Sequence, residues 1–140
     1  MPKNEQPIFP RAPVIGVALI DTANPNLDGT GAIVDVVAGG ADGTRIDSLR
    51  VKAIGTTTAG MVRLFLSTDN GVTYQLWREI PVAAITPSAT VAAFEEDILL
   101  DDPGTSKPLL LPSADYILAA ATENAEDFQV FAHGQSLAAE

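Results

Sequence analysis

Short apolar runs, separated by turn-forming residues, divide most of the chain. Apolar residues alternate with polar ones inside the runs, as Leu49, Val51 and Ala53 do, which is typical of half-buried strands. Gly and Asn tolerate positive φ and Pro fixes turn entry, so their clusters mark chain reversals. The pattern predicts an all-β fold: an antiparallel β-sandwich, jelly-roll-like, of about eight strands. The predicted strand regions are 14–21, 32–37, 45–54, 61–67, 72–82, 91–100, 108–111, 116–122 and 128–133.

Two hairpins are predicted among these strands. Asn70-Gly71 stands between two β-rich runs, and this dipeptide is the strongest short-range hairpin signal. Residues 124–127 are expected to form a second hairpin, between the runs 116–122 and 128–133. A helix is the alternative for 113–121, because Ser113 could cap the Ala-rich segment that follows. We prefer a strand there.

In the run 61–67, apolar residues occupy both even and odd positions, so both faces of a strand there would carry apolar side chains. Val62, Leu64 and Leu66 would line one face, while Met61 and Phe65 would line the other. A two-layer sandwich buries only one face of each sheet in its own core. The second face implies either a subunit contact or cover from loops and the N-terminal arm. Ordinary exposed hydrophobic residues are the remaining explanation, since folded surfaces are largely apolar.

The first thirteen residues carry four prolines and are predicted to form an extended arm. A sandwich domain would follow at 14–134, and 135–140 would be a C-terminal tail. A frayed terminus is the alternative reading of the arm. Large apolar residues are costly to leave in water, which favours contact with a partner. The candidate contact residues of the arm are Pro7, Ile8, Phe9, Pro10 and Arg11.

A second candidate interface is Trp77 with Arg78, because Trp and Arg are enriched at interface hot spots. Strict alternation would place Trp77 on the face opposite Tyr74, Leu76 and Ile80. A lone Trp in a strand also often fills a core, so both roles stay open for Trp77.

Composition narrows the possible partners. The chain has 140 residues, the size of one domain, and a formal net charge of −10. This charge opposes binding to nucleic acid and to anionic membrane surfaces. Cysteine is absent, so disulfides and thiolate metal sites are excluded. The N-terminus lacks the apolar stretch of a signal peptide and no run is long enough to cross a membrane, so synthesis in the cytoplasm is expected.

Catalysis is not expected from this sequence, and neither is a cofactor. His133 is the only histidine, and a triad or zinc site is hard to build around it. The acidic segments 95–97 and 101–102 are the best metal candidate, yet they lack EF-hand spacing, so a solvated acidic edge is preferred. The Gly-rich segment 39–43 lacks the Lys of a phosphate-binding loop and is interpreted as a turn.

Several phrases resemble small proteins encoded in the head-gene regions of tailed bacteriophages. They are GTRI at 43–46 leading into LRVKA at 49–53, GTTTAGMVRLF at 55–65, LWREIP at 76–81 and NAEDF at 124–128. The resemblance covers roughly residues 14–134 and excludes the first thirteen residues and the acidic stretch 95–102.

The resemblance implies a virion component, a capsid cement (decoration) protein. Such proteins commonly form trimers of β-sandwich or jelly-roll subunits on the outside of the shell, where they join neighbouring major capsid proteins. The expected partners are therefore other copies of this chain and the major capsid protein, on the capsid exterior. The alternatives are another virion part, such as a head-spike base, a tail or a fibre module, and a carbohydrate-binding β-sandwich.

Overall fold

The computed structural model describes residues 9–100 and 108–138, which contain nine β-strands and no helix. The all-β prediction is therefore confirmed, and each predicted run contains most of one observed strand. The strands are β1 (Phe9–Ile20), β2 (Val34–Ala38), β3 (Thr44–Ala53), β4 (Gly60–Ser67), β5 (Gln75–Val82), β6 (Glu95–Leu99), β7 (Leu109–Leu111), β8 (Ile117–Thr122) and β9 (Phe128–Ala138).

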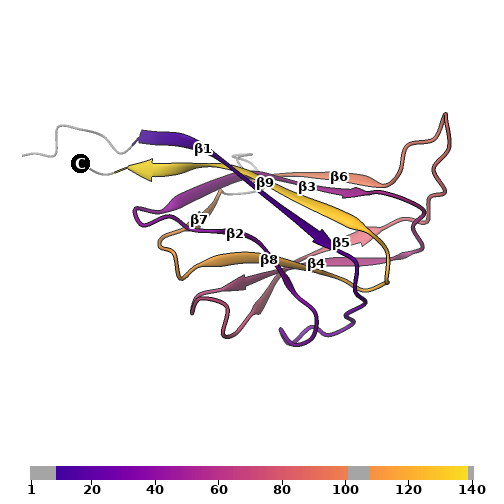
Figure 1. Cartoon of the computed structure of the whole chain (residues 1–140), viewed down its shortest axis with the longest axis horizontal. Coiled ribbons are helices and arrows are strands. Elements are labelled where there is room, and N and C mark those ends of the chain that lie inside the picture. Colours follow the sequence, from indigo (N-terminus) through magenta and orange to yellow (C-terminus); the bar gives the residue numbers. More distant parts are fainter. Residues whose placement is uncertain (1–8, 101–107, 139–140) are drawn as a thin grey trace, which may run out of the picture.

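The strands form two stacked antiparallel sheets (Figure 1). Sheet A has the order β1-β9-β3-β6, with the short β7 also paired to β3, and sheet B has the order β2-β8-β4-β5. The chain passes repeatedly from one sheet to the other, and its first and last strands are neighbours. This order is that of a jelly roll, an eight-stranded double Greek key, with β7 added.

The core lies between the sheets and follows the period of two. Ile46, Leu49 and Val51 project inward from β3, and Val62 and Leu64 project inward from β4. Phe94 and Phe128 meet edge to face with ring centroids 6.4 Å apart. Because β9 lies between β1 and β3, the inward residues of the last strand complete the sheet A side of this core.

The Asn70-Gly71 prediction is confirmed, since β4 and β5 pair in antiparallel register around this turn. Asn70 has φ 60° and Gly71 has φ 83°, the left-handed conformation that these two residue types tolerate. Asp69 organises the loop: its carboxylate accepts hydrogen bonds from the Thr73 amide (2.9 Å) and the Ser67 hydroxyl (2.9 Å). Local polar contacts therefore hold the reversal.

The predicted hairpin at 124–127 is wrong. β8 pairs with β2 and β4 in sheet B, whereas β9 pairs with β1 and β3 in sheet A, so this turn carries the chain between sheets. Its polar groups bind the β3–β4 connection: Glu126 accepts the Thr58 amide at 2.7 Å, and Asn124 Nδ2 donates to Thr58 Oγ1 at 3.0 Å. Residues 117–122 form a strand, not the alternative helix.

The domain boundaries differ from those expected. β1 begins at Phe9, inside the predicted arm, and β9 continues to Ala138, inside the predicted tail. The two extensions pair with each other, with Phe9 opposite Ala138 and Pro13 opposite Gln135. An edge strand tolerates proline because one side of its backbone has no ladder to satisfy. Pro7 and Ile8 lie outside the described residues.

Candidate functional site

The outer face of sheet B, the face turned away from the core, is covered by the chain itself. Phe65, Ala119 and Ala121 are buried there, and so is Arg63, which is only 7% exposed. The loop 21–33, which joins β1 to β2, lies against this face. The Asn24 amide donates to the Thr122 carbonyl at 2.8 Å, and Arg63 Nη1 donates to the Asn24 carbonyl at 3.4 Å.

Asn24 also holds this loop in shape. Its side-chain Nδ2 donates to the carbonyls of Thr30 (2.9 Å) and Ala32 (3.1 Å), and its Oδ1 accepts the amide of Asn26 (3.0 Å). The two-faced pattern of β4 is therefore explained by loop cover, one of the alternatives that the sequence left open. No subunit contact is needed to bury Phe65.

The outer face of sheet A is different, because the described residues leave much of it open. The register aligns its side chains in rows across the strands. One row contains Ile15, His133, Ser48 and Leu99; the next contains Val17, Phe131, Arg50 and Asp97; a third contains Leu19, Gln129, Lys52 and Glu95.

The β1 side of this face is apolar. Ile15, Val17 and Leu19 are 65%, 54% and 49% exposed, and Phe131 of β9 is half-buried beside Val17. Three large aliphatic side chains on one strand face form a contiguous apolar stripe, unlike the singly scattered hydrophobic residues of an ordinary surface. We call Ile15, Val17 and Leu19 the β1 stripe.

The opposite side of the face carries ion pairs. Arg50 Nε donates to Asp97 Oδ1 at 2.7 Å, Arg45 Nε to Asp47 Oδ1 at 2.6 Å, and Lys52 Nζ lies 3.8 Å from Glu95 Oε1. Each cation has an anion, so these pairs carry no net charge. The hydrogen bond from Arg50 lowers the pKa of Asp97 below its ordinary value, and the charge of Arg50 acts in the same direction.

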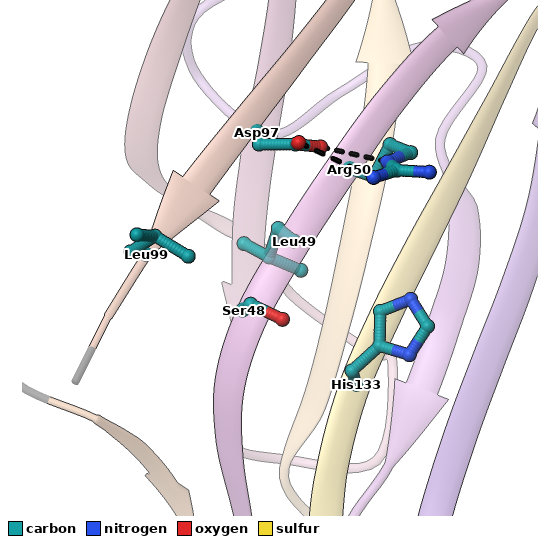
Figure 2. Close-up of a pocket in the computed structure, with 6 residues that line it drawn as sticks. All are labelled: Ser48, Leu49, Arg50, Asp97, Leu99 and His133. Carbon is teal, nitrogen blue, oxygen red and sulfur yellow. Dashed lines mark hydrogen bonds and ion pairs between the residues drawn. The ribbon is translucent and has the colours of Figure 1, made fainter.

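An open hollow of about 400 Å³ lies within this polar half (Figure 2). Asp97 is turned toward Arg50, while His133 lies across β3 near Ser48. In the described part of the chain, no hydrogen bond joins His133 to Ser48 or to Asp97. A nucleophile and its general base typically lie within such contact, and Ser48 and His133 do not share one. The hollow is lined by Ser48, Leu49, Arg50, Asp97, Leu99 and His133.

The predicted interface residues are not brought together. Phe9, Pro10 and Arg11 belong to β1 at one edge of sheet A, beside β2, whereas Trp77 belongs to β5 at the far edge of sheet B. A register shift interrupts the β4–β5 ladder at Trp77, so strict alternation fails there. Trp77 packs against the main core on the same side as Ile80, which corrects the predicted facing, and Arg78 is exposed.

Sequence reasoning missed the β1 stripe. The signal was present, because residues 14–20 are uninterrupted by any polar side chain, so both faces of that strand had to be apolar. The position of the loop 21–33 decides which of the two outer sheet faces stays open. Strand periodicity does not predict where a loop lies.

Two other features, a metal site and a membrane-spanning helix, are also not found among the described residues. In 9–100 and 108–138, no three His, Asp or Glu side chains gather as a metal site would require. Asp101 and Asp102 of the acidic segment fall outside those ranges. The same ranges contain no helix able to cross a membrane.

No protein-family model matches this chain, and no curated protein matches it in sequence. The chain is thus characterised by its own architecture: a jelly roll with one outer face covered by a loop and the other left open.

Proposed function

We propose that this protein is a non-enzymatic structural component of a tailed-bacteriophage virion, a capsid cement protein that self-associates and clamps adjacent major capsid proteins on the shell exterior. The observation that carries the proposal is the open outer face of sheet A, where the β1 stripe lies beside neutral ion pairs. Apolar patches of this kind on soluble proteins mark contacts with other proteins. The sequence phrases that resemble phage head-region proteins supply the identity of the partner.

The architecture is compatible with this role. Jelly rolls recur in viral capsid proteins, and also in lectins and cupins, so the fold alone does not select among them. Cement proteins act by multivalency: several modest contacts on one oligomer raise the effective concentration of each. The resemblance implies a trimer as the oligomer that supplies those contacts.

Carbohydrate binding finds less support. Stacking on sugars needs exposed aromatic faces, yet Trp77 and Tyr116 pack against the core. Tyr74 is half-buried, and its hydroxyl donates to Asp35 Oδ1 at 2.7 Å. The chain contains no other Trp or Tyr residue.

The decisive experiment mixes the purified protein with phage heads that lack it. We expect saturable, stoichiometric binding distributed over the shell, visible by cryo-electron microscopy. Density confined to one vertex or to the tail would instead identify a different virion part, such as a spike base or fibre module. Absence of binding to any part of the particle would refute the proposal.

Two variants refine the test. Leu99→Lys alters the polar half of the outer face, where Leu99 is 61% exposed, and should weaken binding to heads; Val72→Lys, in the exposed β4–β5 loop, is the matched control. Deletion of residues 1–8 keeps β1 whole and tests the arm. If the arm contacts the shell, this deletion weakens binding; equal binding would show that Pro7 and Ile8 are not contact residues.

A further inference from the structure

The β4–β5 turn contains two adjacent residues, Asn70 and Gly71, that can react with each other. The main-chain nitrogen after an asparagine can attack the side-chain amide carbon and close a five-membered ring. Glycine leaves this nitrogen unhindered because it has no side chain, whereas proline has no amide proton to give up. In the part of the chain that the structure describes, the other asparagines precede Pro25, Leu27 and Ala125. Asn70 therefore has the most reactive neighbour among them.

The other described asparagines hold their side-chain amides in hydrogen bonds to nearby residues. They are Asn24, which donates to the Thr30 and Ala32 carbonyls, Asn26, which donates to Thr30 Oγ1, and Asn124, which donates to Thr58 Oγ1. Asn70 is exposed, and no hydrogen bond joins its side chain to another described residue. Its amide carbon is therefore free to turn toward Gly71 when the loop permits.

The folded turn restrains the attacking nitrogen. The Gly71 amide donates to Ser67 Oγ at 2.8 Å, and Ser67 Oγ donates to Asp69 Oδ1 at 2.9 Å. The Asn70 amide donates to the Asp115 carbonyl at 2.9 Å. Ser67 is 0% exposed, so water cannot readily replace its hydroxyl as the acceptor. Attack requires the nitrogen to lose its proton, which the Ser67 hydroxyl holds and which the negative charge of Asp69 makes harder to remove.

We infer that Asn70 is a site of spontaneous deamidation in this protein, and that the hydrogen bond from the Gly71 amide to Ser67 keeps the reaction slow in the folded chain. Hydroxide removes the Gly71 amide proton, and the nitrogen then bonds to Asn70 Cγ. The Cγ–Nδ2 bond breaks, and the leaving nitrogen takes a proton from water and departs as ammonia. Water next opens the cyclic imide at one of its two carbonyl carbons, which gives either aspartate or isoaspartate.

The two products differ in what they do to the turn. Aspartate tolerates the left-handed φ of 60° that Asn70 adopts, so this product can keep the turn while adding a negative charge. Isoaspartate runs the main chain through the former side chain and lengthens it by a methylene group. The amides on either side of that group then no longer reach Ser67 and Asp115 together. The isoaspartyl form should therefore lose contacts that hold the β4–β5 turn.

The test follows deamidation by peptide mapping and mass spectrometry of the full chain, incubated in mildly alkaline buffer with and without urea. We expect native protein to be modified at Asn70 before any other described asparagine. The native rate at Asn70 should be at least about tenfold lower than the rate in urea, because the turn must open first. Earlier modification of another described asparagine, or equal rates at Asn70 in the two conditions, would overturn the inference.

A pair of serine variants tests the restraint itself. Ser67→Ala removes the acceptor of the Gly71 amide and should speed deamidation of the native protein roughly two- to tenfold, the factor that one hydrogen bond is worth. Ser88→Ala is the matched control, since Ser88 Oγ accepts main-chain amides in a turn beyond the other end of β5. This control should keep the native rate, and all three proteins should react equally fast in urea. An unchanged native rate in Ser67→Ala would contradict the role of the hydrogen bond.

The variant Asn70→Asp carries the aspartate product alone and separates the effect of charge from that of the longer main chain. Its urea midpoint should stay close to that of fresh wild-type protein. Aged wild-type protein, enriched in isoaspartate at position 70, should unfold at a lower urea concentration than either. Equal midpoints for the aged protein and Asn70→Asp would contradict the predicted loss of turn contacts.

Discussion

Arg63 places a positive charge on the outer face of sheet B, beneath the loop 21–33. Its Nε lies 3.1 Å from Glu79 Oε1 and its Nη2 lies 3.6 Å from Glu123 Oε2, while Nη1 reaches the Asn24 carbonyl. The side chain is 8% exposed, whereas both glutamates are about 40% exposed. Arg63 thus connects β4, β5, the end of β8 and the loop 21–33 in a single site.

Replacing Arg63 by Met should lower the free energy of unfolding by about 1–3 kcal/mol, because the buried Asn24 carbonyl and two carboxylates lose their cation. The loss is smaller than for a fully buried ion pair since water still reaches the glutamates. Urea unfolding at neutral pH measures it. Arg78→Met, at an exposed position of the next strand, should change stability by less than about 0.5 kcal/mol. Equal effects of the two variants would show that burial of Arg63 is unimportant.

Tyr74 provides a spectroscopic readout of the contact between β2 and the β4–β5 loop. Burial, together with its hydrogen bond to Asp35, raises the pKa of Tyr74 to about 12. The folded protein holds the phenolic proton more tightly than the unfolded chain, so this contribution to stability is present below pH 10 and is lost between pH 10 and 12.

An ultraviolet titration of the two tyrosines should therefore show one phenol ionising near pH 12, and Tyr74→Phe should remove that step. Tyr116→Phe is the control that should leave the step in place. If Tyr74→Phe leaves the high-pH step unchanged, the Tyr74–Asp35 hydrogen bond is absent in solution.

At the scale of elements, Gly134 allows β9 to approach β3 closely where the two strands pair. A Cβ at this position would lie 1.9 Å from the Arg45 carbonyl oxygen and 2.9 Å from Ile46 Cα. The register between β3 and β9 shifts at this point, between Ile46 and Ser48, so the two backbones approach closely.

Gly134→Ala should consequently lower the free energy of unfolding by about 1–3 kcal/mol, the usual cost of overpacking. Gly55→Ala is the matched control, because a Cβ there meets no heavy atom within 4 Å. Thermal and urea unfolding of the pair should separate them clearly. A neutral Gly134→Ala would mean that the close approach relaxes without cost.

The β4–β5 turn makes an acid-sensitive contribution. Hydrogen bonds from Thr73, and more weakly from Ser67, lower the pKa of Asp69 below its ordinary value of 3.8. The stability that this carboxylate provides is therefore present above about pH 4 and is lost as the pH falls through the lowered pKa.

Asp69→Asn should accordingly destabilise the protein at pH 7, and its effect should shrink as the pH falls through the lowered pKa of Asp69, because the wild type then loses the same charge. Urea unfolding over a series of pH values from 7 downward gives the comparison, and Asp42→Asn serves as an exposed control. A destabilisation that is independent of pH would assign the role of Asp69 to side-chain shape instead of charge.

Strand positions followed from the sequence because periodicity and turn chemistry are local. The run at 45–54 and the turn at Asn70-Gly71 depend on residues close together in the chain, and both matched. Pairing partners are not local. The turn at 124–127 resembles a hairpin in sequence, yet β8 pairs within sheet B and β9 pairs within sheet A. Trp77 was misplaced because a bulge changes the parity of the strand without any distinctive residue.

At the scale of the whole molecule, the two outer faces determine how the chain meets other proteins. The loop 21–33 covers the outer face of sheet B around Arg63, whereas sheet A presents the β1 stripe, the ion pairs and the hollow around His133. The sequence predicted that some second apolar face existed, but it pointed to β4. The loop that covers β4 is polar and irregular, so the sheet face on which it packs could not be predicted from the local sequence pattern.

The position of β9 between β1 and β3 also means that, during synthesis, β1 must wait for its partner strand. The end of β1 and the start of β9 are separated by 108 residues (128 − 20), and β1 has no other partner in its sheet. At about 5–20 residues per second, β1 leaves the ribosome roughly 5–20 s before the strand that shelters it. A chain stalled before Phe128 should therefore expose Val14–Ile20 to chaperones and proteases. Release of the completed chain should then bury the core-facing side of that segment in one step.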